Sequence, residues 1–309
     1  MKLIILIGFC FSTMLLNAQD PEVKALKTSS ERSIKKDPND TLPKLWKKGG
    51  IFGVNLSQGT LSHWASGGDK FSLALNAVLG LHAFYKKGKN NWDNTFDFNF
   101  GYIKTTSLGS RKNDDRIDLL SKYGHAITSK WNAALIFNFR SQFFKGYTYD
   151  ENGMGTLSSS FLSPAYILVG AGLDFKPCPP FSMFLSPISS RWVIVAKDAL
   201  AATGAYGVDP GKHSKNEIGA FVSFNYFKET TKSLVYKGRL DLFSNYKHHP
   251  EKIDLYMTNV LNVKLSRSLA LTYSLDMIYD DDVRIFGDNH DRPALQIKSL
   301  IGVGFLLKF

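Results

Sequence analysis

Apolar and polar residues alternate with a period of two along most of the chain, which is the pattern of a β-strand with one apolar face. The final segment, LQIKSLIGVGFLLKF, shows this clearly, because nearly every second side chain from Leu295 to Phe309 is apolar. The positions between them mix glycine, polar and charged residues. The same alternation predicts strands at 71–85, 92–102, 131–147, 165–175, 218–226, 234–246 and 269–279.

Weaker alternation predicts four more strands, near 51–57, 115–125, 253–265 and 181–196, the last of which is interrupted by Pro187. The total is about twelve strands. Many of them are eleven to seventeen residues long. Strands in soluble sheets most often have about five or six residues, whereas a tilted strand that crosses a bilayer needs about nine to eleven. The lengths therefore favour a membrane barrel over a soluble β-sandwich.

The connections between the predicted strands alternate in length along the chain. Short ones lie at 86–91, 128–130, 176–180, 228–232 and 266–268, and longer ones near 58–70, 104–114, 148–163, 197–216 and 281–292. Only the short connection 247–251 departs from the alternation. Short turns at one end and long loops at the other are typical of an outer-membrane barrel, with the short turns in the periplasm.

The predicted fold is an all-β, transmembrane, antiparallel up-and-down barrel of about twelve strands over residues 49–309. Hydrocarbon offers no hydrogen-bond partner, so the first and last strands must pair and close the sheet. Aromatic residues are expected in two girdles at the membrane interfaces. Tyr85, Trp92, Trp131, Phe175 and Phe309 stand at short-turn ends, and Tyr102, Tyr147, Tyr246 and Tyr279 at long-loop ends.

The start of the chain predicts export. Residues 1–18 combine Lys2 with an apolar run of the length found in secretory signal peptides, and cleavage is expected after Ala18. Residues 19–48 are polar and rich in lysine, and are expected to form a mobile periplasmic tail. The exported chain then has one cysteine, Cys178, and no disulfide of its own. The predicted location is the cell outer membrane.

The net charge of +11 arises partly in this tail. A basic chain can bind nucleic acid, but the export signal and the absence of a nucleic-acid-binding motif argue against that partner. We interpret the charge as suited to lipopolysaccharide or peptidoglycan nearby. The expected partners are therefore outer-membrane lipid and lipopolysaccharide, and the sequence leaves the oligomeric state open.

Three motifs resemble an uncharacterised family of Bacteroidetes outer-membrane β-barrel proteins, a domain of unknown function. They are VNLSQGTLSHWASGGDKFSL after the first strand, RIDLLSKYG at 116–124 and YDDD at 279–282, and the resemblance covers roughly residues 45–309. The terminal Phe309 after an alternating strand also resembles the signal that the barrel-assembly machinery reads, which implies that machinery as a partner. The family implies location and fold but no activity, catalytic residue or cofactor.

Alternation also predicts which polar residues point into the lumen. They are Asp97, Arg140, Gln142, Lys237, Arg239, Asp241 and Asp276. Such charges either pair and plug the lumen or line a small polar pore, and the mixture of both signs favours pairing. On the same basis, an added charge is expected to be tolerated at the inward Asn138 better than at the lipid-facing Leu135.

Two functions follow from these alternatives. The first is a narrow pore or transporter for small polar solutes. The second is a structural or accessory barrel with a plugged lumen that docks a periplasmic partner. A third, an outer-membrane hydrolase, would need a catalytic triad, and the adjacent Ser62 and His63 are weak evidence because neighbouring side chains point in different directions. We expect no enzyme activity.

Two loops contain residues that bind metals in other proteins. One holds His248 and His249 near Glu251, and the other holds Asp280, Asp281 and Asp282 with Asp288 and Asp291. A solvated loop is expected at the His pair. The spacing of the aspartates matches no EF-hand, so solvation or ion pairing between loops is expected there. No metal or cofactor is predicted.

Overall fold

A computed structural model describes residues 45–60, 70–107, 109–150, 153–178, 180–231, 233–266, 269–284 and 292–308. Several sequence-based predictions concern residues outside these ranges. They are the signal peptide, nearly all of the tail 19–48, the Ser62–His63 pair, Asp288, Asp291 and Phe309.

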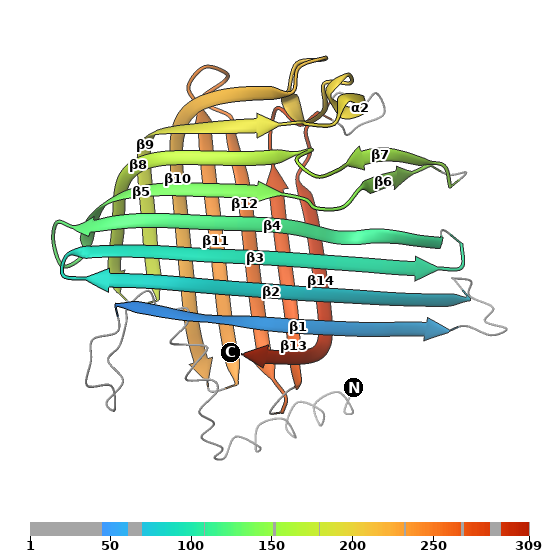
Figure 1. Ribbon diagram of the computed structural model, residues 1–309, viewed down its shortest axis with the longest axis horizontal. Helices are drawn as coiled ribbons and strands as arrows, with labels where there is room; N and C mark the ends of the chain where they lie inside the picture. The colour runs from blue at the N-terminus through green and yellow to red at the C-terminus, as the bar shows by residue number, and fades with distance from the viewer. Residues whose placement is uncertain are drawn as a thin grey trace, which may run out of the picture.

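Twelve antiparallel strands form a closed barrel in which β1 is paired with β14, as the sequence predicts (Figure 1). The strands are β1 (Trp46–Thr60), β2 (Phe71–Lys87), β3 (Asn90–Thr105), β4 (Gly109–Ala126), β5 (Trp131–Ser141), β8 (Ala165–Cys178), β9 (Phe181–Ile194), β10 (Ser214–Thr231), β11 (Leu234–Asn245), β12 (Ile253–Lys264), β13 (Leu269–Tyr279) and β14 (Gln296–Lys308). Each strand pairs with its neighbour along the chain, except that β5 pairs with β8 across an inserted hairpin. Among the described residues, no helix is long and apolar enough to cross a membrane.

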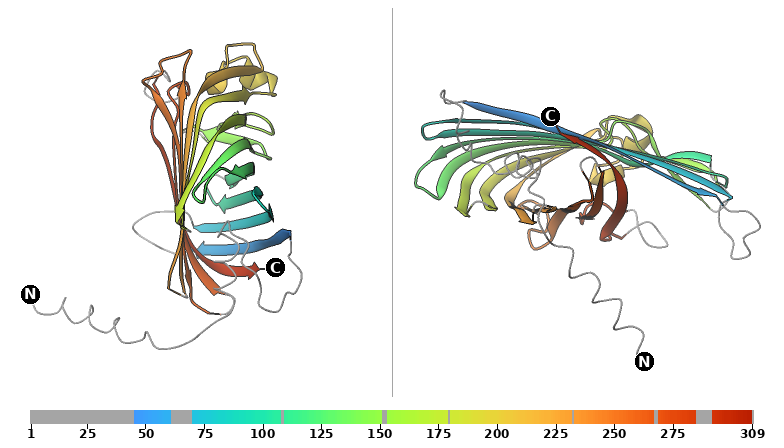
Figure 2. Two further views of the ribbon diagram at one scale, coloured as in Figure 1. Left: turned by 90° about the vertical axis from the view of Figure 1, so that its left-hand side faces the viewer. Right: turned by 90° about the horizontal axis from the view of Figure 1, so that it is seen from below.

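The barrel is flattened into two walls, and the strands of one wall run steeply across those of the other (Figures 1 and 2). In Figure 1 the near wall contains β1 to β5, β8 and β9, while β10 to β14 form the far wall. Short turns lie at one end, and the longer connections lie at the other, together with the short β3–β4 connection at 106–108. By the layout of outer-membrane barrels, we call these the periplasmic and extracellular ends.

The predicted strand 131–147 is interrupted in the structure. β5 ends at Ser141, and the chain then forms a two-stranded hairpin of β6 (Gly146–Tyr149) and β7 (Gly155–Ser159). The carboxylate of Asp115 accepts hydrogen bonds from the backbone N–H groups of Phe143 (2.9 Å) and Phe144 (2.7 Å). These bonds replace a strand ladder at the point where the chain leaves the barrel wall, so the alternation continues while the strand does not.

The predicted long loop 104–114 is also wrong, because β3 and β4 pair as far as Thr105 and Gly109. The polar residues of this segment predict a loop, but residues 104–105 and 109–115 extend the two strands beyond the length that a membrane requires. Above a membrane both faces of a strand meet water, so polarity there does not exclude a strand. β1 likewise begins at Trp46, five residues before the predicted range.

Pro187 lies within β9 at a β-bulge. The pairing of β8 with β9 shifts between Ala171 and Leu173, and the pairing of β9 with β10 shifts between Gly219 and Phe221. The hydroxyl of Ser186 lies within hydrogen-bonding distance of the carbonyl oxygens of Ala171 (2.8 Å) and Ile188 (2.9 Å). A proline has no N–H for the ladder, and the bulge accommodates it inside a strand that is paired on both sides.

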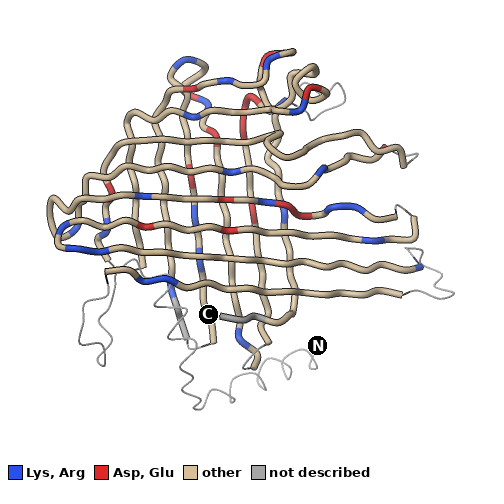
Figure 3. Tube along the Cα trace, viewed as in Figure 1, with Lys and Arg blue, Asp and Glu red and all other residues tan. Residues whose placement is uncertain are grey.

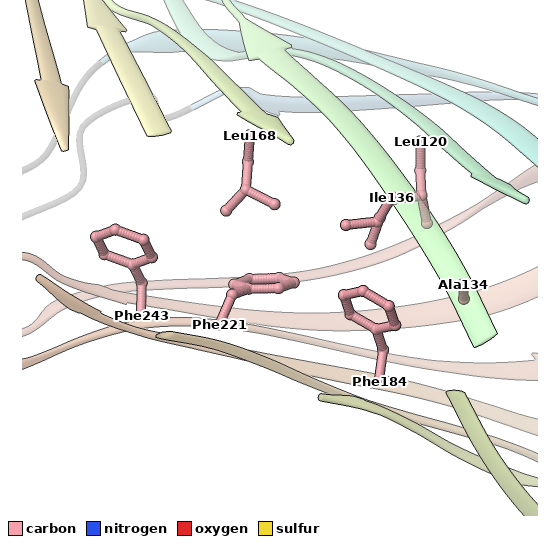
Figure 4. Close-up of a cluster of buried hydrophobic side chains, with 7 residues drawn as sticks. All are labelled: Leu120, Ala134, Ile136, Leu168, Phe184, Phe221 and Phe243. Atoms are coloured by element: carbon pink, nitrogen blue, oxygen red, sulfur yellow. The ribbon is translucent and has the colours of Figure 1, made fainter. Parts of the chain in front are cut away.

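Two groups of buried apolar side chains stabilise the structure. The first lies inside the barrel, where side chains from β4, β5 and β8 face those of β9, β10 and β11 (Figure 4). It consists of Leu120, Ala134, Ile136, Leu168, Phe184, Phe221 and Phe243. The second lies at the extracellular end, where Leu200 and Ala201 of helix α2 (Asp198–Ala201), with Val208 after the short helix η1 (Ala205–Gly207), pack on Val193 and Val195.

Candidate functional site: a charged network across the lumen

The centre of the lumen holds Arg140 of β5 between two carboxylates. Its Nε donates to Asp118 of β4 at 2.9 Å, and its Nη2 donates to Asp241 of β11 at 2.5 Å. Arg239 joins the same two acids, at 2.8 Å from Asp241 and 3.6 Å from Asp118. Two arginines and two carboxylates therefore form one neutral, largely buried network, which we call the central network (Arg140, Asp118, Arg239 and Asp241).

A second contact joins opposite sides of the barrel directly. Nη1 of Arg116 on β4 donates to the hydroxyl of Tyr256 on β12 at 2.8 Å. In the strand order, five strands separate β4 from β12 in either direction around the barrel. The guanidinium of Arg140 also lies over the Tyr256 ring, 3.8 Å from its centre. Side chains thus bridge the full width of the lumen at this level.

The bridge continues toward β13 and β14. Arg116 lies 3.5 Å from Asp276, and Lys298 lies 3.1 Å from Asp276 and 2.8 Å from Asp114. Buried charges are retained in a low-dielectric site only when they are paired, because an unpaired one keeps its desolvation cost. The mixed signs noted in the sequence are therefore used for pairing in this part of the lumen.

Of the seven predicted lumen residues, Arg140, Arg239, Asp241 and Asp276 take part in these bridges. Lys237 lies on the same face of β11 as Arg239, and its side chain is exposed. Asp97 is half-buried and pairs in register with Asp118. Gln142 lies just beyond β5, where its side-chain oxygen accepts from Lys112 at 2.8 Å.

Sequence reasoning missed Arg116, Asp118 and Tyr256. Arg116 and Asp118 lie in RIDLL, where the weak strand 115–125 was predicted without a lumen-facing side. In the sequence, the charges of Arg116, Asp118 and Lys122 fall on the same alternating set of positions and would have identified that side. Tyr256 carried no such signal, because its role depends on a strand that lies opposite.

A separate charged group lies at the extracellular end. Arg191 of β9 bonds to Glu217 of β10 and Asp254 of β12, each at 2.5 Å, and lies 3.8 Å from Asp280. Lys215 bonds to Asp282 at 2.6 Å and lies 2.9 Å from Glu217. These contacts attach the start of the β13–β14 connection to the rim of the barrel.

The three aspartates of this connection therefore pair with cations of the chain. Burial raises the pKa of Asp280, against the attraction of Arg191. Burial would also raise the pKa of Asp281, but hydrogen bonds from Lys252 and Arg284 outweigh it and hold that pKa below its usual value. In the described part of the chain, no group of three or more His, Cys, Asp or Glu side chains is placed to hold a metal ion.

We expect Asp281→Asn to loosen this connection by a few tenths of a kcal/mol, because Lys252 is partly exposed and its ion pair is screened by water. With a lowered folded-state pKa, the ionised Asp281 stabilises the fold above about pH 4, and this contribution is lost as the pH falls through the folded-state value. The reporter is hydrogen exchange at the Val283 amide, which bonds to the Asp280 carbonyl oxygen at 3.2 Å. Equal exchange in parent and variant at neutral pH would contradict the expectation.

The loop with His248 and His249 also contains a contact between side chains of the chain itself. His249 has a left-handed backbone conformation with a φ of 46°, and its Nδ1 lies 3.1 Å from a carboxylate oxygen of Glu251. Both members of this pair are largely exposed. The geometry is that of a local turn closed by a contact between two side chains.

At the periplasmic end, Lys122 and Asp174 are buried and bond at 2.5 Å, and Lys176 lies 3.0 Å from Asp174. Basic and acidic segments are distributed over both walls instead of being confined to one end (Figure 3).

A pocket of about 240 Å³ lies beside the β6–β7 hairpin and includes Lys112, Asp115 and Gln142 in its lining. Lys112 already bonds to both of these side chains, so it is part of the scaffold of the pocket.

Solved structures with a similar arrangement are outer-membrane barrels. An outer-membrane channel from Pseudomonas putida F1 has 12% identity and a TM-score of 0.41, over 89% of this chain and 100% of that one. The NanC porin has 11% identity and a TM-score of 0.37, over 83% and 98%. The translocator domain of the autotransporter NalP from Neisseria meningitidis has 11% identity and a TM-score of 0.36, over 92% and 93%. No curated protein sequence matches the chain significantly.

One family model matches part of the chain. It covers residues 56–147, from the second half of β1 to the start of the β6–β7 hairpin, and is described as a protein of unknown function (DUF3078). This family model, like the family that the sequence resembles, has no assigned activity.

Proposed function

We propose that the chain is an outer-membrane barrel that does not conduct solutes along its axis and serves as a structural or accessory protein. Membrane insertion is supported by the outward face, which is apolar between two aromatic girdles. On β3, Trp92 near the periplasmic end and Tyr102 near the extracellular end are ten residues apart. At about 3.4 Å per residue and a tilt near 45°, they are about 24 Å apart along the barrel axis, close to the height of the apolar band of outer-membrane barrels.

Other strands support the same placement. At the periplasmic end, Trp46 packs against Tyr85 (5.2 Å between ring centres) and Trp92 (5.7 Å), and Trp131 packs against Phe175 (4.4 Å). Such rings are favoured where hydrocarbon meets headgroups. The outward Leu135 and Ile301, between the two ends, have exposed fractions of 57% and 73%. Apolar side chains with this exposure are suited to contact lipid.

The contact between Arg116 and Tyr256 is the main support for a closed lumen. It connects strands on opposite sides of the barrel, and the central network lies beside it. On the side of β8 to β11, the cluster of Figure 4 fills the interior with apolar side chains. A solute moving along the axis would have to separate buried ion pairs or enter this apolar cluster, and both are costly.

The recording of currents across a planar bilayer tests this function. The protein is first shown to be folded by its shifted mobility on an unheated gel, so that silence cannot be attributed to unfolded chains. We expect no steady conductance from the parent protein. A matched variant replaces the four charges of the central network in pairs, Arg140→Gln and Arg239→Gln with Asp118→Asn and Asp241→Asn. Steady single-channel steps from the parent protein would overturn the proposal.

A narrow pore for small polar solutes is the second candidate, and one observation favours it. The inner wall opposite the apolar cluster carries glycines, among them Gly80 on β2 and Gly302 on β14. A Cβ at Gly302 would have no neighbour closer than 3.6 Å. Conductance in the parent protein that is blocked when a bulky side chain replaces Gly302 would support this candidate over the first.

A proposed partner is the barrel-assembly machinery, through Phe309. One aromatic ring contributes little to the stability of a whole barrel, so we expect deletion of Phe309 to leave refolding in detergent almost unchanged. In cells, we expect the deletion to reduce the amount of folded protein in outer-membrane fractions, measured by mobility with and without heating. Equal amounts in parent and variant would argue against recognition of the terminal residue.

A further inference from the structure

One edge of β4 has no partner strand where β4 extends beyond β5. The ladder of β4 with β5 reaches only Ile117 and Ser141, while β4 continues to Gly109 and, among the described residues, is paired there with β3 alone. The β6–β7 hairpin lies beside this part of β4 and projects in the same direction (Figure 1). The pocket of about 240 Å³ lies in the gap, between residues 112–115 of β4 and residues 146–147 and 158–159 of the hairpin.

The lining of this pocket is polar and its charges are already paired. Lys112 lies 3.0 Å from Asp115, and Asp114 lies 2.8 Å from Lys298. In the described part of the chain, the lining side chains that make no hydrogen bond are those of Asn113, Tyr147 and Ser158. An amide and two hydroxyl groups can both donate and accept hydrogen bonds. The pocket is smaller than the sites of drug-sized ligands, which begin at about 300 Å³, so it fits one neutral, hydroxyl-rich ring such as a sugar.

A row of aromatic rings lies next to the pocket. It begins at Tyr102 of the extracellular girdle and ends at the turn before β8, with ring centres 4.9 to 6.3 Å apart. We call it the aromatic row, and it consists of Tyr102, Phe100, Phe144, Phe143 and Phe161. Phe143 and Phe161 are 53% and 49% exposed. Because it begins in the girdle, the row lies where hydrocarbon meets headgroups.

A buried ion pair holds the pocket and the aromatic row together. The Nζ of Lys112 donates to the carbonyl oxygen of Phe144 at 2.8 Å. The Asp115 side chain is 1% exposed and accepts from the backbone N–H groups of Phe143 and Phe144. Lys112 and Asp115 also line the pocket. The surface is therefore fixed in advance, which lowers the ordering cost of binding a ligand.

Two exposed lysines flank this surface. Lys145 stands in the chain between Phe144 of the aromatic row and Gly146 of the pocket, and Lys104 follows Tyr102 by two residues on β3. Neither lysine forms an ion pair within the residues that the structure describes, in contrast to Lys112. Cations that lie beside an aromatic girdle and have no carboxylate partner are placed to pair with anionic headgroups.

We propose that the pocket, the aromatic row and Lys145 form one binding site for the phosphorylated, acylated saccharide of lipopolysaccharide in the outer leaflet. A sugar ring occupies the pocket, acyl chains lie along the aromatic row, and a phosphate group pairs with Lys145. The segment FFKGY, residues 143–147, contributes to all three parts of the site. The proposal rests on the membrane location proposed above. A second copy of the chain is a poorer match, because it would leave the polar pocket empty.

Titration with fluorescently labelled lipopolysaccharide tests the site, with polarisation as the readout and the full chain folded in detergent micelles. We expect saturable binding by the parent protein. Tyr147→Ala should weaken it at least about tenfold, the scale of losing one anchoring ring. Lys145→Gln should weaken it several-fold and reduce its dependence on salt. Both residues lie outside the barrel wall, so each variant should retain the shifted mobility of the folded barrel on an unheated gel.

Tyr246→Ala and Lys247→Gln are the matched controls. Both residues are exposed at the extracellular end, after β11 on the far wall. We expect both controls to bind like the parent. Equal binding by all four variants, or no saturable binding by the folded parent, would overturn the site. A chain that stays in aqueous solution without detergent would overturn the membrane placement and this site with it, so the two failures can be distinguished.

Competition identifies which part of the lipid is recognised. Unlabelled phosphatidylglycerol has a phosphate and acyl chains but no sugar ring, so we expect it to displace the probe much less than unlabelled lipopolysaccharide does. Equal displacement would overturn the assignment of a sugar to the pocket.

Photocrosslinking tests the occupant in cells. A benzophenone side chain at position 147 should form adducts that stain as lipopolysaccharide, and one at position 246 should form far fewer. A dimer of the chain crosslinked through position 147 would overturn the proposal in favour of an interface between two copies.

Discussion

Replacement of Arg140 by methionine is expected to lower the free energy of unfolding by about 3–5 kcal/mol, the usual cost of removing one partner from a buried ion pair. Asp118 and Asp241 would lose the cation that lies 2.9 and 2.5 Å from them, and only Arg239 would remain between the two carboxylates. Methionine retains much of the volume, so the effect reports mainly on charge. The measurement is urea unfolding of the barrel in lipid vesicles.

Lys237→Met is the matched control. Lys237 lies on the same inner face of β11 as Arg239, but its side chain is exposed, so a change within about 0.5 kcal/mol is expected. Arg140→Met combined with Asp241→Asn should cost less than the sum of the single changes, because Asp241→Asn removes the excess negative charge that Arg140→Met leaves beside Arg239. Equal losses at 140 and 237 would show that the central network contributes little to stability.

The second large loss of stability is expected from a substitution on the outward face of the barrel wall. Leu135→Arg should lower the free energy of unfolding by about 2–4 kcal/mol, because the folded barrel would hold the charged guanidinium in hydrocarbon near the membrane midplane. Leu135 is four residues above Trp131 of the periplasmic girdle and 57% exposed to the surroundings of the barrel. Tyr102→Arg, on the same outward face but at the extracellular girdle, should cost only about 0–1 kcal/mol. Similar losses at both positions in vesicle unfolding would contradict the membrane placement.

The sequence predicts that Asn138→Arg lowers stability less than Leu135→Arg. The surroundings of Asn138 in the structure do not favour that difference. Asn138 does face the lumen, but it is only 6% exposed and donates to Asp118 at 2.6 Å and to the Leu119 carbonyl oxygen at 3.0 Å. An arginine there would add a cation beside Arg140 and displace both bonds. We therefore expect a substantial loss at this position as well.

The strands and their inward faces could be predicted because successive side chains of a barrel strand point inward and outward in turn, which gives the sequence a period of two. Leu135 and Asn138 were assigned to opposite sides in this way, and their exposed fractions of 57% and 6% confirm the assignment. The end of β5 could not be predicted, because it depends on the carboxylate of Asp115, a residue of a different strand. Alternation records the environment of each side chain but not the hydrogen-bond partner of the backbone.

The candidate site was predictable in composition and not in geometry. A set of inward charges of both signs indicated pairing, and Arg140, Arg239 and Asp241 do pair. Which charge meets which depends on the flattening of the barrel, and this brings Arg116 to Tyr256 from the opposite side. A round barrel with the same alternation would keep these two residues apart, so the period alone cannot distinguish a plugged lumen from a pore.

The distance between Trp92 and Tyr102 also has a consequence for where the chain accumulates. A bilayer whose hydrocarbon exceeds about 24 Å must become thinner around the strands or submerge one of these rings, at a cost of fractions of a kcal/mol for each Å of mismatch. That cost falls in membranes of short acyl chains and in the bacterial outer membrane, which is thinner than average. For a barrel placed in a membrane as proposed above, bilayer thickness would select among membranes independently of any targeting sequence.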